Sequence, residues 1–513
     1  MKRFIVRYLP LGVLIAMASQ LFADDDLCGN NFTGAPSAAP PSLHVGVILV
    51  QFSDWQGNVD SRGSHCQRHG EVNHYTVQEF NRHLFSQNIY RTPDPDDLNS
   101  EPRTHDREAI FGSMRDFYDE NSYGKFLLTG EILNDSTFNE ITEKWVPVWV
   151  TLNQTKGAWD SLGINPTRLL DSTLAVSGID TTGFEKMILI YAGEERRDGL
   201  NPATSGNRFV YQIGEKKKGS STRGRTNTPG TFYGIGTHCH EFGHLLFLPD
   251  LKGGSTQIRG LSEWDLMAVG NQGFMDGDPF NETIGGYHAP THLGGWSKLC
   301  LGWANYEEFT EGNLTFPHFE EDDQICVYFI NDSDPSNWDE GEYFIFENRR
   351  PTFSDGARTF DGDMHRDATV GGLLIVHHND ASPSQFSNGL DLKVIEADNN
   401  NSVGESVGAG NMADIYPGVN DNTEFSESST PSSNDVDGNP TGLALLNITN
   451  NNGVVSTIVD FGPPAAPQNL VIANPSEDGA NPILQWDANT EPDLNHYLVW
   501  RGTTPNWKTT PIT

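Results

Sequence analysis

One short segment limits the fold of this chain more than any other. Residues 238–250 read HCHEFGHLLFLPD and contain the pattern His-Glu-x-x-His as His240, Glu241 and His244. On an α-helix, residues i and i+4 lie on one face, so both imidazoles can reach one metal ion. Glu241 follows the first histidine, where its carboxylate can take a proton from a metal-bound water. The segment therefore predicts a largely buried helix that binds Zn²⁺, with Glu241 as general base.

The third metal ligand has two candidates. Asp250 follows His244 by six residues, which is the spacing of the metzincin pattern His-Glu-x-x-His-x-x-Gly-x-x-His/Asp. That pattern has glycine where this chain has Phe247, and phenylalanine resists the positive φ of a sharp turn. The alternative is Glu263, nineteen residues after His244, which could bind from a second element as in thermolysin-like enzymes. We expect Asp250 and keep Glu263 as the alternative.

A methionine turn is predicted beyond the helix. Residues 264–270 read WDLMAVG. Met267 in a Gly-bounded turn below the metal would be the Met-turn, the second sequence feature of metzincins after the His-Glu-x-x-His helix. Two neighbours of the motif are not expected to bind metal. His238 lies two residues before His240 and points about 200° away from it on a helix, and Cys239 also lies off the ligand face.

The composition and the N-terminus predict an exported protein. The chain carries 33 Lys and Arg against 69 Asp and Glu, a formal net charge of −36. Such a chain repels phosphate backbones and anionic lipid, which argues against nucleic-acid binding. Three basic residues within positions 2–7 precede an apolar run over residues 9–18, which is too short to span a bilayer. Residues 1–23 therefore read as a signal peptide, and no membrane attachment is expected after its cleavage.

The catalytic part is predicted to be an α/β (α+β) domain over residues 44–310, after a Pro- and Ala-rich linker at 24–43. Its buried strands are expected at 45–52, 126–132 and 186–191, and its helices at 76–90 and 106–122. We expect the strand at 209–213 to be an edge strand that pairs with an extended substrate.

The remaining chain is predicted to be β-rich. Residues 311–462 hold short β-prone runs between loops of Asp, Asn, Ser and Gly, which indicates a sandwich-like domain. Residues 463–467 form a stiff Pro-rich linker. The tail, at 463–513 with its linker, shows the opening strands of a fibronectin type III-like module, about half of the about 100 residues that this fold needs.

Five cysteines in an exported chain permit disulfides. The pairs nearest in sequence are Cys28 with Cys66 and Cys300 with Cys326, which leaves Cys239 unpaired. Tyr287, His288 and His292 lie where a side chain could assist an oxyanion, although ordinary packing is the preferred interpretation. Acidic turns at 276–278, 361–363 and 435–438 could bind Ca²⁺, although most such clusters are only turns.

Taken together, these segments resemble the M6 family of secreted metalloproteases, the immune inhibitor A type. The matching stretches span about residues 45–460 and read VILVQFSD, GSMRDFYDENSYGKFLLTGEI, HEFGHLLFLPDL, SEWDLMAVG, PTHLGGWSKLCLGW, EYFIFENRR, GGLLIVHHND and ADIYPG. The resemblance implies a zinc endopeptidase with a zincin/metzincin-like catalytic domain, a following β-sandwich-like domain, bound structural Ca²⁺, and protein or peptide substrates.

Two other functions stay open on the sequence. The chain could be a catalytically silent binding or adhesion protein on a protease scaffold, although the intact set of His240, Glu241 and His244 argues against that. It could also be a zinc hydrolase of a non-protein substrate, such as a glycan-linked amide. No pattern indicates an oligomeric state.

Overall fold

The computed structural model describes the chain from residue 38 onward, in segments. The described ranges are 38–53, 76–88, 112–140, 144–160, 165–194, 203–205, 210–217, 231–232, 234–251, 261–273, 290–330, 338, 340–363, 371–380, 391–400, 403, 410–462, 469–472, 484–487, 499–500 and 511–512. The predicted signal peptide, the pairing of Cys28 with Cys66, Tyr287, His288 and the acidic turn at 276–278 lie outside these residues.

The first sheet is built around strand β1 (Ser42–Phe52), at the position predicted from its apolar run. β1 pairs in parallel with β2 (Leu127–Ile132), β5 (Val150–Leu152) and β6 (Lys186–Glu194), and β6 pairs in parallel with β8 (Val210–Lys217). β7 (Ala203–Ser205) and β9 (Thr231–Phe232) are antiparallel to β8. The order β2-β1-β6-β8-β7 makes β1 an internal strand, which is why both of its faces are apolar.

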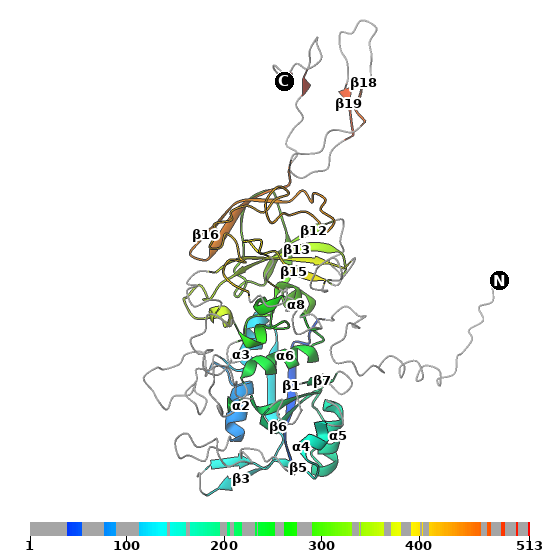
Figure 1. Cartoon of the computed structure of the whole chain (residues 1–513), viewed down its shortest axis with the longest axis vertical. Helices are drawn as coiled ribbons and strands as arrows, with labels where there is room; N and C mark the ends of the chain where they lie inside the picture. Colours follow the sequence, from blue (N-terminus) through cyan, green and yellow to red (C-terminus); the bar gives the residue numbers. More distant parts are fainter. Residues whose placement is uncertain are drawn as a thin grey trace, which may run out of the picture.

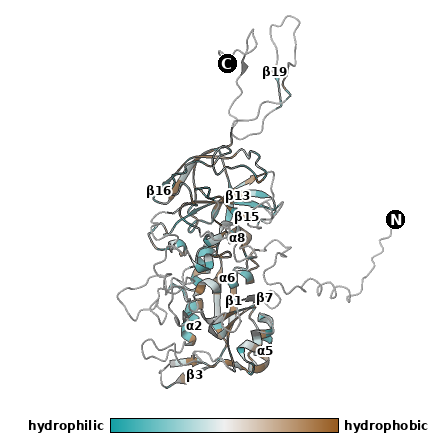
Figure 2. Ribbon diagram, in the orientation of Figure 1, coloured by the Kyte–Doolittle hydropathy of each residue, from teal (hydrophilic) through white to brown (hydrophobic). Residues whose placement is uncertain are grey.

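Helices cover both faces of this sheet (Figure 1). Alternate residues of β1 pack with α2 (Val77–Phe85), α3 (Met114–Asn121) and α6 (Ile235–Leu245) in one core cluster. The intervening residues of β1 pack with α4 (Lys156–Asp160) and α5 (Pro166–Ser177). α5 carries both hydrophobic and hydrophilic residues (Figure 2), as expected for a helix that covers a sheet with one side. A hairpin of β3 (Ser136–Asn139) and β4 (Lys144–Pro147) lies apart from this sheet.

The second sheet shares the first core. It has the order β10-β12-β13-β14-β15, with β10 at Asn305–Glu308, β12 at Gln324–Ile330, β13 at Glu342–Arg349, β14 at Gly372–Asn379 and β15 at Leu392–Val394. One face of β12 and β13 joins the core of the α/β part through Val327 and Ile345, beside helix α8 (Gly295–Cys300). The two parts are therefore held together by a continuous apolar core.

The other face of this second sheet packs against a third sheet. That sheet has the order β11-β17-β16, with β11 at Gly312–Thr315, β16 at Ala444–Asn451 and β17 at Val454–Asp460. Three short 3₁₀ helices, η1 (Ser262–Trp264), η2 (Gly270–Gln272) and η3 (Phe360–Asp363), lie in connections. In the tail, β18 (Val471–Ile472) pairs with β19 (Leu484–Gln485), and β20 (Val499–Trp500) with β21 (Pro511–Ile512).

Two expectations about strands and cysteines are wrong. Strand β8 is not an edge strand, because its residues 210–212 pair with β7 on the side away from β6. Cys300 and Cys326 form no disulfide with each other. Cys326 alternates with Ile325 and Val327 along β12, so it points into the core on the opposite face of the sheet from Cys300.

No helix in the described segments is both long and apolar enough to pass through a bilayer.

A buried arginine joins the second sheet to the segment before Met267. Arg349, at the end of β13, is fully buried. Its Nε donates to Asp361 Oδ2 at 2.6 Å, and its Nη1 donates to Glu347 Oε2 at 2.8 Å and to the Trp264 carbonyl at 3.0 Å. The guanidinium thus compensates two buried carboxylates and fixes one turn of the α/β part.

We expect Arg349→Met to lower the free energy of unfolding by about 3–5 kcal/mol, because Glu347 and Asp361 would lose the guanidinium that compensates their buried charges. The adjacent Arg350→Met is the matched control, since Arg350 is only partly buried, and it should cost less than about 1 kcal/mol. Urea unfolding followed by tryptophan fluorescence measures both. Equal losses for the two variants would contradict this account of Arg349.

Candidate metal centre

The predicted metal-binding helix is present as α6. It runs over Ile235–Leu245 with Gly234 as N-cap, and ten of its eleven residues are buried. Its sides contact the first sheet and helix α3, whose Tyr118 hydroxyl donates to the Cys239 carbonyl at 2.6 Å. A helix buried on nearly all sides exposes little but the end that carries His244, so its polar residues need partners inside the protein.

Backbone carbonyls orient both histidines. His240 Nδ1 donates to the Leu266 carbonyl at 2.9 Å, and His244 Nδ1 donates to the Leu248 carbonyl at 2.8 Å. A carbonyl can only accept, so each ring carries its proton on Nδ1 and presents the Nε2 lone pair on the opposite side. Burial, helped by the neighbouring His240, lowers the pKa of His244, which favours the neutral ring. Both rings are therefore set up as metal ligands.

Asp250 completes a group of three possible ligands. Its Oδ1 lies 3.1 Å from His240 Nε2 and 3.7 Å from His244 Nε2. The three ligand atoms all lie within 4.8 Å of one another. In a tetrahedral site with zinc distances of about 2.0–2.2 Å, neighbouring ligand atoms lie about 3.3–3.6 Å apart. Two imidazole nitrogens and one carboxylate oxygen at this spacing suit Zn²⁺, and they leave a fourth position for water.

The sharp turn before Asp250 forms in spite of Phe247. Phe247 has φ +71°, in the left-handed region. The Leu248 amide donates to the Gly243 carbonyl at 3.1 Å, and the Phe247 amide donates to the His244 carbonyl at 3.0 Å. These two bonds define a Schellman motif, which usually has glycine at the left-handed residue. The ring of Phe247 lies 4.9 Å from Lys186 Nζ, a cation–π contact that offsets part of the strain.

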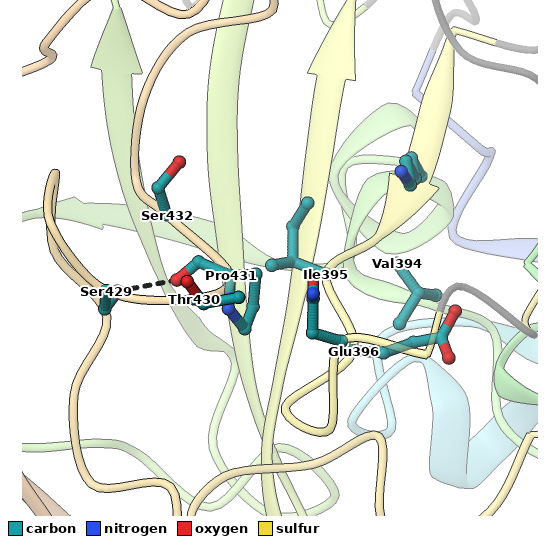
Figure 3. A pocket seen from close by; sticks show the side chains of 9 residues that line it. Val394, Ile395, Glu396, Ser429, Thr430, Pro431 and Ser432 are labelled. Atoms are coloured by element: carbon teal, nitrogen blue, oxygen red, sulfur yellow. Dashed lines mark hydrogen bonds between the residues drawn. The ribbon is translucent and has the colours of Figure 1, made fainter.

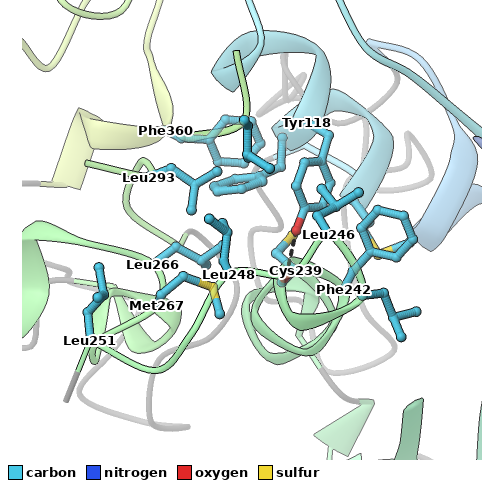
Figure 4. Packing of buried hydrophobic residues seen from close by; sticks show 14 of the residues in the cluster. Tyr118, Cys239, Phe242, Leu246, Leu248, Leu251, Leu266, Met267, Leu293 and Phe360 are labelled. Atoms are coloured by element: carbon cyan, nitrogen blue, oxygen red, sulfur yellow. Dashed lines mark hydrogen bonds between the residues drawn. The ribbon is translucent and has the colours of Figure 1, made fainter. Parts of the chain in front are cut away.

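Met267 lies directly against helix α6 (Figure 4). A Cβ on Gly243 would lie 2.5 Å from Met267 Sδ, so a side chain at this helix position would require the thioether of Met267 to move. The Met267 segment also holds the chain that follows the helix, because the Leu251 amide donates to the Met267 carbonyl at 2.9 Å. Leu251 directly follows Asp250, so the Met267 segment positions both His240, through the Leu266 carbonyl, and the carboxylate.

Glu263, the alternative third ligand, is bonded elsewhere. It is fully buried, and its Oε2 accepts from the Ser262 hydroxyl and from the Gly410 amide. The structure groups Asp250, and not Glu263, with the two histidines. Glu241 is also buried, at 8% exposure, on the helix turn between the two histidines. As the residue next to His240, it lies about 100° around the helix from it.

The other residues singled out from the sequence belong to the surrounding packing. His238 is buried against Tyr211, whose hydroxyl lies 2.9 Å from His238 Nδ1, and burial lowers the pKa of His238 to about 3. Cys239 is a buried thiol. His292 Nε2 lies 2.6 Å from Glu120 Oε1 and belongs to a buried polar network. None of the three belongs to the group formed by His240, His244 and Asp250.

Asp265 is a positioning residue that the sequence analysis missed. Its Oδ1 accepts from the Met267 amide at 2.6 Å, and its Oδ2 accepts from the Gly294 amide at 2.7 Å and the Ser297 hydroxyl at 3.2 Å. Burial raises its pKa to about 6. An aspartate two residues before a turn residue is a signal for this bond, but the Gly294 contact joins segments 29 residues apart and has no local pattern. The Leu248 and Leu266 carbonyls have no sequence signal.

Comparison with known proteins adds no identification. No protein-family profile matches the chain. No curated protein matches it with significant similarity.

The strain at Phe247 predicts an unusual order of stabilities. Phe247→Gly and Phe247→Ala both remove the ring and its contact with Lys186, but only glycine relieves the left-handed φ. Strain relief of about 1–2 kcal/mol outweighs the about 0.4–1 kcal/mol that glycine loses through unfolded-chain entropy. The glycine variant should therefore be more stable than the alanine variant by about 0.5–1 kcal/mol. Urea unfolding of both purified variants measures this, and a more stable alanine variant would contradict it.

The two candidate third ligands predict different zinc affinities. Asp250→Ala should weaken zinc binding by more than the about 10- to 100-fold typical of outer-shell changes. Glu263→Gln should keep zinc affinity within that range, because Glu263 lies outside the group. Competition with a chromophoric chelator measures both affinities. Loss of zinc from Glu263→Gln but not from Asp250→Ala, with both variants folded by circular dichroism, would reverse the assignment.

Proposed function

We propose that the protein is an exported zinc-dependent endopeptidase of the M6 type that hydrolyses peptide bonds in extracellular proteins. The observation that carries this proposal is the convergence of His240, His244 and Asp250, with both Nδ1 atoms committed to backbone carbonyls. A neutral, oriented imidazole pair with one carboxylate and an adjacent glutamate is the donor set of a hydrolytic zinc site.

In this proposal, His240, His244 and Asp250 hold the metal. When bound, Zn²⁺ lowers the pKa of a coordinated water toward about 7 and polarises the scissile carbonyl. Glu241 accepts the proton of the attacking water and later delivers it to the leaving amine. The burial of Glu241 supports this role, since it excludes bulk water from the carboxylate that carries the proton.

Support for export and for the family comes from the sequence. The basic N-terminus and apolar run of residues 1–23 are typical of a signal peptide. The stretches that resemble M6 proteases include both parts of the proposed site, HEFGHLLFLPDL and SEWDLMAVG. In the structure these two stretches are joined by the bonds from His240 to the Leu266 carbonyl and from Leu251 to the Met267 carbonyl. The proposal therefore rests on one site that both stretches build.

We expect Glu241→Gln to lower the rate of casein hydrolysis by about 10²- to 10⁴-fold, the usual contribution of general acid–base catalysis. It should keep its zinc, because Glu241 is not among the three ligands. The exposed Glu185→Gln is the matched control and should change neither quantity. Fluorescent casein cleavage and zinc content by mass spectrometry are measured on the full-length chain.

Each other outcome points to a different function. A wild-type protein that holds zinc and cleaves no protein would overturn the endopeptidase and favour a hydrolase of non-protein substrates. A wild-type protein that binds no zinc would favour a binding protein on a protease scaffold. Equal cleavage by wild type and Glu241→Gln would remove Glu241 from the mechanism.

A further inference from the structure

A second group of possible metal ligands lies in the β-rich part, just beyond edge strand β15. It consists of Glu396, Asp398 and Asp414, whose ligand oxygens lie within 4.8 Å of one another. Glu396 and Asp414 are buried, with 3% and 0% exposure. The loop that carries the first two is fixed to the third, because the Ala397 amide donates to the Asp414 carbonyl at 2.8 Å. Acidic groups brought together and buried in this way repel one another and lose their hydration.

One carboxylate oxygen in this group receives no hydrogen bond from the residues that the structure describes. Asp414 Oδ2 accepts from the Trp264 indole at 2.9 Å and from the Asn411 amide at 2.7 Å. Asp414 Oδ1 is buried and has no hydrogen-bond partner. In the described part of the chain, neither Asp398 nor Asp414 pairs with a lysine or arginine. A buried carboxylate oxygen with no donor, in a group of three carboxylates, is a position where a bound cation would offset the cost of burial.

The acidic turns considered from the sequence differ from this group. Asp361 is compensated by Arg349, with 2.6 Å between Asp361 Oδ2 and Arg349 Nε. Asp435 accepts from the backbone and side-chain amides of Asn439, at 2.6 and 2.9 Å, within a local turn. Their oxygens already have donors, so only the group around Asp414 leaves an oxygen for a bound ion among these three.

We propose that Glu396, Asp398 and Asp414 bind a hard divalent cation of the Ca²⁺ class. Carboxylate oxygens are the ligands that Ca²⁺ prefers, and Mg²⁺ is seldom held by dedicated protein ligands alone. Glu396 also lines a cavity of about 390 Å³, together with Asn399, Ser429 and Thr430, and Figure 3 shows Glu396 among the residues around it. Ca²⁺ takes six to eight oxygen ligands, so the three carboxylates would be joined by water or backbone oxygens.

The bound cation would stabilise a loop that contacts the segment before Met267. Gly410 packs so closely on Trp264 that a Cβ there would lie 2.6 Å from the indole Nε1. The same Nε1 donates to Asp414. Neutralising Asp414 by a cation therefore strengthens the end of a loop that holds Trp264 in place. This inference does not depend on the proposed protease activity, because cation binding is measured without substrate.

The indole of Trp264 can report on cation binding, because it donates a hydrogen bond to Asp414 and therefore lies beside the proposed site. Tb³⁺ replaces Ca²⁺ in oxygen sites and luminesces when a nearby indole is excited. Zinc-loaded, full-length protein should give Tb³⁺ emission on tryptophan excitation, and excess Ca²⁺ should remove it. We expect Asp414→Asn and Asp398→Asn each to weaken Tb³⁺ and Ca²⁺ binding at least about tenfold, because affinity depends on the number of charged ligands. Ca²⁺ should raise the melting temperature of wild type more than that of either variant.

Two control variants make the result specific. Asp435→Asn removes an aspartate from the neighbouring turn and should leave Tb³⁺ binding unchanged. His244→Ala should lose zinc and keep the Tb³⁺ signal, which separates this group from the proposed zinc centre. Wild-type Tb³⁺ affinity in both Asp414→Asn and Asp398→Asn would overturn the proposal, as would the absence of any Ca²⁺-displaceable emission. Asp398 is only partly buried, so its variant remains informative if Asp414→Asn unfolds.

Discussion

The close contact between helix α6 and Met267 is the constraint on which the candidate site depends. Because Gly243 has no side chain, the sulfur of Met267 can lie against the helix backbone. That approach brings the Leu266 carbonyl within 2.9 Å of His240 Nδ1 and lets the Leu251 amide bond to the Met267 carbonyl. One turn thus orients a histidine from one side and holds the chain after Asp250 from the other. A larger residue at 243 would have to displace the side chain of Met267, which is fully buried in a close-packed core.

The parts of this fold that follow from local pattern were predictable, and the parts that depend on distant partners were not. The apolar run of β1 and the motif on α6 carry their own signals, and both elements lie where the sequence places them. The interior position of β8 depends on pairing with β7, a strand of only three residues with no hydrophobic period. The turn at Phe247 was unexpected because its strain is offset by contacts that residue type alone does not encode, including Lys186 from β6. Glu263 looked like a ligand by spacing alone, and its bond to Gly410 spans 147 residues.

Buried carboxylates occur in two different environments in this acidic protein. Around Arg349, buried carboxylates are compensated by a guanidinium that reaches Asp361 and Glu347 at hydrogen-bond distance. Around Asp414, a buried carboxylate oxygen has no such donor. The two candidate metal centres also differ in chemistry. Imidazole nitrogens with one carboxylate suit zinc, whereas a group of carboxylates alone suits a harder cation.

Trp264 connects these features through two hydrogen bonds and through its place in the chain. Its indole donates to Asp414, its carbonyl accepts from Arg349, and its chain continues through Asp265 into the Met267 turn. The second sheet is therefore connected to the proposed zinc ligands through buried, hydrogen-bonded groups. Since the apolar core is also continuous across this boundary, the β-rich part is a structural support of the candidate site. An α/β part cut off near residue 310 would lose Arg349 and Asp414 together, and with them two of the bonds that fix the turn beneath helix α6.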